Sequence, residues 1–426
     1  MRKWIIILFF LTSCSFSNVV YESDTEINVF FCPEDMCMEK IIDLIDSSDE
    51  IKCAFYDLDL PELIEKLKEK KVEVIIEDSN ALDDFITGYS PALMHNKFCV
   101  FDNNIVLTGS LNPTERGNYY NNNNIVIIKS KYLAENYLDE FEELKNNEYG
   151  SGKKVKYPMI SLGNIKIESY FCPEDNCKLR VINALKAANH SIFFMTYSFT
   201  DEDIGNLLWN KNYLGVNVKG ILEKKQISDY SRYDDLKEFS ITDNNKYIMH
   251  HKVFVIDNKT VITGSYNPTK NANERNDENL LIIHDSKTAE KYLVEFNKLY
   301  DYKEIIPNTA TDLFFSKVLY DAVGNDKNNE FIELKNIGSN TLNLAYFFIS
   351  NNKTNSRLTG RIKPNETIII KPKFSLKNTD GILLLKFAYN IIDYVAWEGL
   401  WALEAKQGHA LTRVNAGVDE QSWAIN

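Results

Sequence analysis

Apolar and polar residues follow one order of patterns that occurs twice along the chain. Short apolar runs, typical of buried strands, alternate with segments whose apolar residues recur every three or four positions, the spacing of an amphipathic helix. Strands that alternate with helices of this length indicate an α/β sheet. The pattern therefore predicts two α/β halves in succession, residues 26–150 and 151–306.

The elements of the two halves can be matched one by one. In the first half we expect strands at 51–56, 72–77 and 125–128 and helices at 38–48, 60–70 and 131–147. In the second half we expect strands at 191–197, 216–223 and 280–283 and helices at 178–189, 201–211 and 286–300. The second half has about 15 extra residues between Glu223 and Met249, in a position where substrate-selecting loops tend to occur.

The pattern changes after Pro307. Residues 307–426 contain short apolar runs separated at even intervals by Asn, Gly and Asp, which predicts an immunoglobulin-like β-sandwich. We expect its strands at 313–321, 331–336, 345–350, 367–371, 381–387 and 393–396.

Composition is that of a globular protein, with 44% hydrophobic and 26% charged residues. The net charge of -13 argues against a long basic groove for non-specific nucleic-acid binding, although a local positive site can exist in an acidic protein. Residues 308–426 hold 13 Lys and Arg against 12 Asp and Glu, so the acidity belongs to the two halves.

The first residues predict export. Met-Arg-Lys is followed by the apolar run Trp4–Leu11, which is too short to span a bilayer. Leu-Thr-Ser-Cys14 then resembles the bacterial lipobox, in which the cysteine becomes the lipidated first residue. We therefore expect a signal peptide at 1–13, lipidation of Cys14, a linker at 14–25 and a lipid anchor at the bacterial cell envelope. The alternative is a secretory signal with an incidental cysteine.

Export permits disulfides, and four of the seven cysteines lie in the repeated FCPEDxC string. A C-x4-C pair around Pro-Glu-Asp predicts a local turn closed by a disulfide, and no histidine lies near enough to complete a metal site. The expected pairs are Cys32–Cys37 and Cys172–Cys177. Cys53 and Cys99 lie in apolar strand-like strings and are expected to be buried thiols.

One polar motif occurs in both halves without a gap. The first copy is MHNKFCVFDNNIVLTGSLNPT and the second is MHHKVFVIDNKTVITGSYNPT. Their shared positions are His95, Lys97, Asp102, Gly109, Ser110 and Asn112 in the first copy, and His250, Lys252, Asp257, Gly264, Ser265 and Asn267 in the second.

The motif has the chemistry of a phosphate site. Residues two apart on a strand face the same way, so the histidine and lysine of each copy project together. Two such copies would place a histidine on each side of one phosphorus, one to attack and one to protonate the leaving oxygen. Lysines and asparagines would hold the other oxygens, with no metal or cofactor and no need for a second chain. Two purely structural hairpins would need only their turn residues.

The spacing H-x-K-x4-D-x6-G-S-x-N resembles the HKD motif of the phospholipase D superfamily in both copies. The resemblance implies two pseudo-symmetric phospholipase D-like halves that share one active site. It makes the histidines the nucleophile and general acid/base, the lysines and asparagines phosphate ligands, and the serines supporting hydrogen-bond donors. The two aspartates complete the motif at the far end of the strand and are expected to be structural.

The halves differ at one position downstream of the motif, where superfamily members commonly have an acidic residue that orients the opposite histidine. Glu278 stands there in the second half and Asn123 in the first. A carboxylate raises the basicity of a histidine. We therefore expect Glu278 to support His95 as the nucleophile, with His250 as the acid/base.

In their compact size the halves resemble the small bacterial nucleases of the superfamily, and this resemblance implies a nuclease that cleaves DNA or RNA. The string FFSKVLYDAVGNDKNNEFIELKNIGSNTLNL resembles the start of a lamin-tail domain, which in bacteria often accompanies exported nucleases. The alternatives are a generic immunoglobulin-like sandwich in the tail, a membrane-anchored phospholipase D or cardiolipin hydrolase, favoured by the acidity and the lipid anchor, and a non-catalytic lipoprotein that binds DNA or a surface polymer.

Overall fold

The computed structural model describes residues 19–23, 25–301, 312–324, 329–387, 390–398, 401–415, 417 and 419–426. The predicted signal peptide and Cys14 lie outside these residues.

The first half is built on a seven-stranded mixed sheet in the order β2-β8-β7-β6-β3-β4-β5. Its strands are β2 (Glu26–Cys32), β3 (Ile51–Phe55), β4 (Glu73–Glu77), β5 (Ile86–Gly88), β6 (Lys97–Phe101), β7 (Ile105–Gly109) and β8 (Asn123–Lys129). Its helices are α1 (Cys37–Ser47), α2 (Pro61–Glu69), α3 (Glu115–Tyr119) and α4 (Lys131–Lys145).

The second half repeats that strand order from β10 to β13 and adds two strands at one edge, giving β1-β9-β10-β16-β15-β14-β11-β12-β13. Its strands are β1 (Val20–Glu22), β9 (Met159–Leu162), β10 (Ile165–Cys172), β11 (Ser191–Thr196), β12 (Asn217–Leu222), β13 (Ser240–Thr242), β14 (Lys252–Ile256), β15 (Thr260–Gly264) and β16 (Glu278–His284). Its helices are α5 (Cys177–Lys186), α6 (Glu202–Tyr213), α7 (Tyr233–Leu236), α8 (Lys270–Glu274) and α9 (Ser286–Tyr300).

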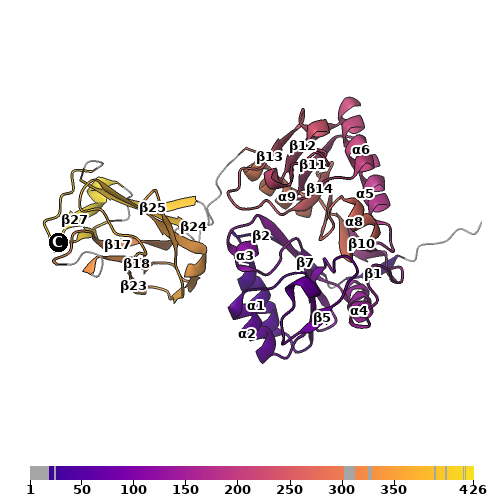
Figure 1. Cartoon of the computed structure of the whole chain (residues 1–426), viewed down its shortest axis with the longest axis horizontal. Helices are drawn as coiled ribbons and strands as arrows, with labels where there is room; N and C mark the ends of the chain where they lie inside the picture. Colours follow the sequence, from indigo (N-terminus) through magenta and orange to yellow (C-terminus); the bar gives the residue numbers. More distant parts are fainter. Residues whose placement is uncertain are drawn as a thin grey trace, which may run out of the picture.

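Helices α4 and α9 lie between the two sheets and share one core with both. Tyr137 and Phe141 of α4 and Tyr292 and Phe296 of α9 belong to one buried cluster with residues of each sheet. Helices α1 and α2 cover the outer face of the first sheet, and α5 and α6 cover that of the second (Figure 1). None of the described helices has the length and apolar content needed to cross a membrane.

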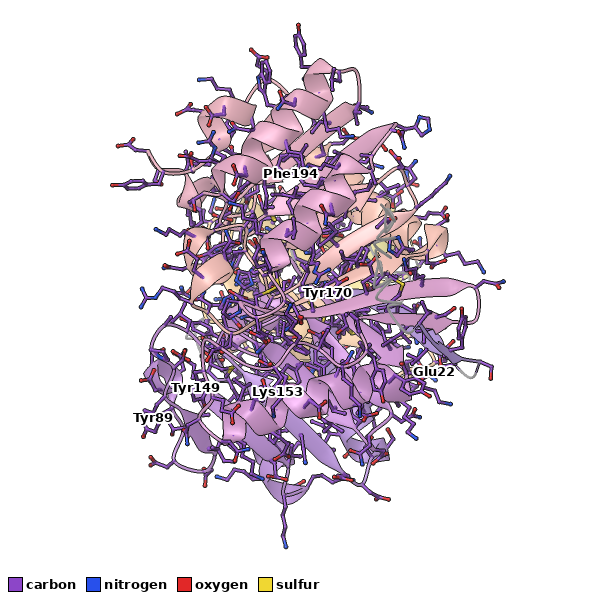
Figure 2. All side chains as sticks on the ribbon, turned by 90° about the vertical axis from the view of Figure 1, so that its right-hand side faces the viewer. Glu22, Tyr89, Tyr149, Lys153, Tyr170 and Phe194 are labelled. Atoms are coloured by element: carbon purple, nitrogen blue, oxygen red, sulfur yellow. A yellow bond between two sulfur atoms is a disulfide. The ribbon has the colours of Figure 1, made fainter. Side chains whose placement is uncertain are left out.

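Part of the predicted linker at 14–25 forms the short strand β1 (Val20–Glu22). β1 pairs in parallel with β9 at the edge of the second sheet. Glu22, labelled in Figure 2, also accepts the backbone N–H of Tyr132 at 2.9 Å. A three-residue strand is too short to show a periodic pattern, and its partner lies far along the chain.

Two disulfides are present as predicted, Cys32–Cys37 and Cys172–Cys177. The prediction of buried thiols at Cys53 and Cys99 is wrong, because these residues form a third disulfide. The two cysteines are directly opposite each other on the antiparallel strands β3 and β6, a register that neither sequence string reveals alone.

The C-terminal region, by which we mean the described residues from 312 onward, is rich in strands and lies beside the first half (Figure 1). It contains sheets in the orders β23-β18-β17-β26-β27, β21-β20-β24-β25 and β19-β22. The strands are β17 (Leu313–Leu319), β18 (Phe331–Asn336), β19 (Leu342–Asn343), β20 (Phe347–Ser350), β21 (Asn355–Arg357), β22 (Arg361–Ile362), β23 (Thr367–Ile370), β24 (Gly381–Phe387), β25 (Asn390–Trp397), β26 (Leu411–Arg413) and β27 (Trp423–Ile425).

Candidate active site

Each motif forms a β-hairpin whose turn is held by its aspartate. Asp102 follows β6 with a positive φ of 48°, and its Oδ1 accepts the backbone N–H groups of Asp49 and Glu50, both at 2.9 Å. Asp257 follows β14 with a φ of 50° and accepts the backbone N–H groups of residues 189–191. The two aspartates therefore fix the ends of the hairpins that lie away from the histidines.

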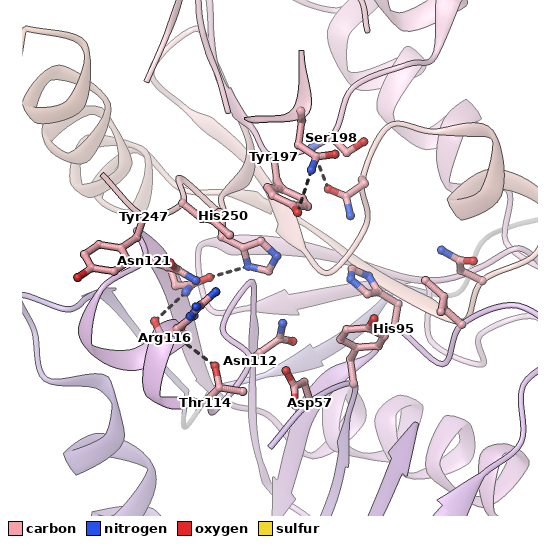
Figure 3. A pocket seen from close by; sticks show the side chains of 18 of the residues that line it. Asp57, His95, Asn112, Thr114, Arg116, Asn121, Tyr197, Ser198, Tyr247 and His250 are labelled. Atoms are coloured by element: carbon pink, nitrogen blue, oxygen red, sulfur yellow. Dashed lines mark hydrogen bonds between the residues drawn. The ribbon is translucent and has the colours of Figure 1, made fainter. Parts of the chain in front are cut away.

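The backbone at each histidine is hydrogen-bonded to the opposite half. The N–H of His95 donates to the carbonyl of Asp277, and the N–H of Asp277 donates to the carbonyl of Leu93, each at 2.9 Å. In the same way the N–H of His250 donates to the carbonyl of Asn122 at 2.9 Å. These crossed contacts bring both histidine rings into one cleft between the halves (Figure 3).

His95 contacts Glu278, the carboxylate that was predicted from the sequence to support it. Its Nδ1 lies 2.7 Å from Oε2 of Glu278, which is fully buried. The same carboxylate accepts the hydroxyl of Ser265 at 2.7 Å and the amide N–H of Asn276 at 3.2 Å. Because Nδ1 is committed to Glu278, Nε2 is the ring nitrogen of His95 that is available to a substrate.

His250 has an amide partner in place of a carboxylate. Its Nδ1 lies 2.9 Å from Oδ1 of Asn123 and 3.0 Å from the carbonyl of Ser110. Both oxygens act here as acceptors, so Nδ1 carries the proton and Nε2 of the neutral ring is unprotonated. Asn123 also accepts the hydroxyl of Ser110 at 2.9 Å and donates to the carbonyl of Gly117 at 2.8 Å.

The two motif lysines are buried beside the histidines. The Lys97 ammonium donates to the carbonyl of His95 at 2.5 Å, and the Lys252 ammonium donates to the carbonyl of His250 at 2.9 Å. Burial lowers the pKa of Lys97 to about 7, although Glu278 opposes the change. Burial and then Lys97 lower the pKa of Lys252 well below its usual value. An anion bound between these lysines would raise the pKa of both.

The same cationic surroundings affect the histidines and the carboxylate. Burial and the two lysines lower the pKa of His95 well below its usual value, and they do the same for His250. Burial raises the pKa of Glu278 to about 7, with Lys97 acting in the opposite direction. Burial therefore disfavours the charged form of the His95 ring and of the Glu278 carboxylate alike.

Two tyrosines pack against the histidines and lysines of the site, and neither was among the site residues predicted from the sequence. Tyr56 follows β3 and Tyr197 follows β11, and each ring meets the histidine of its own half edge-on, with centroids 5.1 and 4.8 Å apart. Each ring face also lies 5.0 Å from the motif lysine of the same half. The signal was present in the repeat, because a tyrosine ends the equivalent apolar strand in both halves.

The motif asparagines, Asn112 and Asn267, line the same cleft, which has a volume of about 970 Å³. Oδ1 of Asn112 is buried and has no hydrogen-bond partner among the described residues. Aliphatic side chains in the lining are few, namely Leu93 and Ile248. The polar and aromatic lining residues include Tyr56, Asp57, Asp59, Thr114, Arg116, Tyr120, Asn121, Tyr197, Ser198, Gln226, Tyr247, Lys270 and Asn276.

Within the described residues, one group of three carboxylates is close enough to hold a metal ion, and it lies elsewhere. Glu140, Glu143 and Glu174 lie close together. Glu140 and Glu143 line a second cleft, which neither His95 nor His250 lines. The groups that meet at the histidines are cations, amides and one carboxylate. Such a set binds a phosphate through its non-bridging oxygens.

A family described as "Cardiolipin synthase, PLD-like domain" matches residues 41–145 and 181–300, which together make up more than half of the chain. The chain belongs to this family of the phospholipase D superfamily. It is therefore a phosphodiesterase of that superfamily, and its two matched segments contain all the motif residues discussed above.

Several relatives resemble about a third of this phospholipase D-like chain. A protein of Rickettsia felis named phospholipase D is 35% identical over 162 residues, which is 36% of this chain and 81% of the relative. A mitochondrial cardiolipin hydrolase of Mus musculus is 30% identical over 126 residues, 29% of this chain and 57% of the relative. Among solved structures, the phospholipase D family member Nuc from Salmonella typhimurium is 31% identical, with a TM-score of 0.31, covering 32% of this chain and 95% of Nuc.

Proposed function

We propose that this phosphodiesterase is a nuclease that hydrolyses DNA or RNA without a metal ion, through a phosphohistidine at His95. The composition of the cleft carries the proposal. A lipid substrate would bring acyl chains, yet the aliphatic lining is limited to Leu93 and Ile248. A nucleotide chain brings polar sugars and phosphates, which suit the amides and hydroxyls of the lining.

An aromatic pair in the cleft wall also suits nucleic acid. The rings of Tyr120 and Tyr247 come from different halves and lie with centroids 4.5 Å apart and planes inclined by 37°. Tyrosine faces stack with nucleobases irrespective of sequence, which contributes about 1–3 kcal/mol per base. Tyr247 comes from the stretch of extra residues in the second half, which the sequence analysis expected to help select the substrate.

In the first step, Nε2 of His95 would attack phosphorus while the bond to the leaving oxygen breaks. His250, protonated at Nε2 once the substrate anion has raised its pKa, would give that proton to the leaving oxygen. Glu278 would stabilise the positive charge that develops on the His95 ring. Lys97 and Lys252 would stabilise the charge on the non-bridging oxygens, together with the two motif asparagines.

In the second step, water would replace the histidine on phosphorus. Nε2 of His250, now unprotonated, would take a proton from the water as its oxygen bonds to phosphorus and the bond to His95 breaks. The product is a phosphate monoester, and both histidines return to their starting state. One chain supplies both histidines, so we propose that a monomer is sufficient for catalysis.

The second candidate function is a phospholipase D or cardiolipin hydrolase. The names of the relatives from Rickettsia felis and Mus musculus favour it. A lipid anchor at Cys14, which we still propose together with export to the cell envelope, would place the cleft near phospholipid. The third candidate is a non-catalytic lipoprotein that binds DNA or a surface polymer. For residues 307–426 we retain the proposal of an immunoglobulin-like, lamin-tail-like domain.

One experiment separates the candidates. The purified protein is incubated with plasmid, single-stranded DNA, RNA and labelled phospholipid vesicles, each in the presence of EDTA. Cleavage of nucleic acid alone supports the proposal, whereas release of a lipid headgroup supports the phospholipase. Turnover of none of them would favour the binding protein. His95→Ala and His250→Ala should each abolish the activity, and phosphate trapped on His250 would refute the assignment of His95 as nucleophile.

A further inference from the structure

Helix α3 lies between the C-terminal region and the active-site cleft. It follows the first motif directly, and Glu115, Arg116 and Gly117 of the helix line the cleft together with Tyr120 just beyond it. The opposite side of the helix faces the C-terminal region, where Tyr119 is buried. Because α3 contacts both, a displacement of the C-terminal region can displace the residues of α3 that line the active-site cleft.

Arg357 of β21 makes the most extensive contact with α3. Its guanidinium lies 3.8 Å from the centre of the Tyr119 ring and donates to the Glu115 carboxylate at 2.6 Å. Nearby, Asn118 donates to the hydroxyl of Tyr346 at 3.2 Å. A planar guanidinium that is both stacked and ion-paired fixes the direction as well as the distance of its partner.

From α3 the contacts continue to His250. The carbonyl of Gly117 accepts the amide N–H of Asn123 at 2.8 Å, and Oδ1 of Asn123 then meets Nδ1 of His250 at 2.9 Å. A side chain could not replace the glycine, because a Cβ at this position would lie 2.1 Å from the carbonyl oxygen of Asn112. The helix is therefore packed tightly against the motif, and its placement determines where the amide of Asn123 lies.

The equivalent helix of the second half, α8, has a different setting. Lys270 and Glu274 pair with each other at the surface at 3.9 Å, in the places that correspond to Glu115 and Tyr119. Asn273 of α8 hydrogen-bonds to Asp201 of the same half at 2.7 Å. In the second half, the residue that contacts the opposite histidine, His95, is Glu278, a buried carboxylate held by its own hydrogen bonds.

We propose that Arg357 is a positioning residue for His250. By docking the C-terminal region on α3, it holds the Gly117 carbonyl and, through Asn123, the orientation of the His250 ring. The inference rests on the proposed role of His250 as acid and base. The contacts that lead from Arg357 to the His250 ring, however, can be tested whether or not the protein turns over a substrate. A domain that is separate from the catalytic halves in sequence is thus part of the support of one catalytic histidine and not of the other.

The first test measures the ring directly. Histidine is labelled with ¹⁵N, and the chain has six histidines, so the ring signals can be assigned with His95→Ala and His250→Ala. Arg357→Ala should shift the Nδ1–H signal of His250 and leave that of His95 in place. Arg361→Ala is the matched control, because Arg361 pairs with Glu39 and Glu62 of the first half and not with α3. Equal shifts of both histidines, or no shift, would overturn the proposal.

The second test separates the two chemical steps with bis(4-nitrophenyl) phosphate, whose leaving group needs no proton. Arg357→Ala should form the phosphoenzyme at nearly the wild-type rate and hydrolyse it about 3- to 10-fold more slowly, because His250 must still activate water. Arg357→Lys keeps the charge but loses the stacking of the planar guanidinium on Tyr119. Its rate of phosphoenzyme hydrolysis should lie between those of the wild type and Arg357→Ala. A general loss of structure would instead reduce the amount of phosphoenzyme formed, and that result would contradict the proposal. A wild-type protein inert toward every diester would refute the proposed function, while the ring signals would still decide on Arg357.

Discussion

The two histidines have equivalent backbone settings and different ring partners. Each main-chain N–H is held by the opposite half, and each ring meets a tyrosine edge-on. His95, however, contacts the carboxylate of Glu278, whereas His250 contacts the amide of Asn123. A carboxylate can stabilise the charge that a histidine gains as it attacks, and an amide cannot do so to the same extent. One residue in each half is therefore the basis of the different roles that we propose for the two histidines.

A second pair of equivalent places differs in charge. One lies where α9 meets the FCPED turn of the first half, and consists of Glu34, His251, Glu295 and Lys298. The other lies where α4 meets the FCPED turn of the second half, and consists of Asn96, Glu140, Glu143 and Glu174. Burial would raise the pKa of Glu295, but Lys298 and His251 outweigh it, so that the pKa is lowered. Burial, then Glu174, raises the pKa of Glu140 well above its usual value.

A third pair concerns the sheets themselves. The disulfide Cys53–Cys99 joins the central strands of the first sheet. At the equivalent position of the second sheet, Phe194 lies opposite Phe254 with ring centroids 6.0 Å apart. Phe194 is fully buried, and Figure 2 shows it among the elements of the second half. The first sheet therefore has a disulfide at the position where the second sheet has an aromatic contact.

The largest expected effect comes from removing the carboxylate. Glu278→Gln should lower kcat about 100- to 1,000-fold, because His95 loses the group that stabilises its positive form and fixes its tautomer. Asn123→Ala, the matched change in the other half, should lower it only about tenfold. Steady-state kinetics on one diester compares the two variants. A greater loss in Asn123→Ala would reverse the assignment of the roles.

Removing the central disulfide should have the next largest effect. Cys53→Ala with Cys99→Ala should lower the free energy of unfolding by about 2–4 kcal/mol, because the bond closes a long loop in the unfolded chain. Cys32→Ala with Cys37→Ala opens a much shorter loop and should cost less. Urea unfolding of both double variants gives the comparison. Equal losses would show that loop length does not govern the effect.

The charged clusters can be made more alike by one change. Glu143→Lys would place an ammonium where Lys298 stands in the other cluster, and should raise the free energy of unfolding by about 1–2 kcal/mol at pH 8. The pKa of Glu174 is raised to about 7 by burial and neighbouring carboxylates. The folded wild type therefore binds protons more tightly than the unfolded chain, and its stability falls as the pH rises from about 4.5 to 7.

Unfolding curves at pH 5 and pH 8 check this prediction. The gain from Glu143→Lys should be smaller at pH 5, where the carboxylates already carry protons. Lys298→Glu, the reverse change in the other cluster, should destabilise the protein at pH 8. A gain that is the same at both pH values would show that the carboxylates of this cluster do not repel one another.

The smallest effect is a shift in pH dependence. Burial and Lys252 lower the pKa of His250, so the acid that we propose loses its proton early as the pH rises. Asn123→Asp would place a carboxylate beside the ring, raise that pKa and move the alkaline limb of kcat/KM upward by about one unit. Profiles from pH 5 to 9 with an oligonucleotide substrate measure the shift. A limb that stays in place would mean that another group controls it.

The repeat let the sequence predict much of this arrangement. The order of strands and helices and the two C-x4-C disulfides follow from patterns that occur twice. The contact of Glu278 with His95 was predicted instead from the position where the halves differ, together with the resemblance to the phospholipase D superfamily. The disulfide Cys53–Cys99 could not be predicted, because it depends on the register of two strands and has no copy in the second half. Arg357 was equally hidden, since nothing near it in sequence indicates that its partner is α3.

The crossed contacts at the histidines have a consequence for how such a site can change over time. A dimer of two identical halves would have the same residue beside both histidines, because a two-fold axis repeats every substitution. In a single chain, a substitution beside one histidine leaves the other untouched. Joining the halves thus frees each side to be selected separately, and the glutamate on one side with an asparagine on the other is a combination that only a fused chain can inherit.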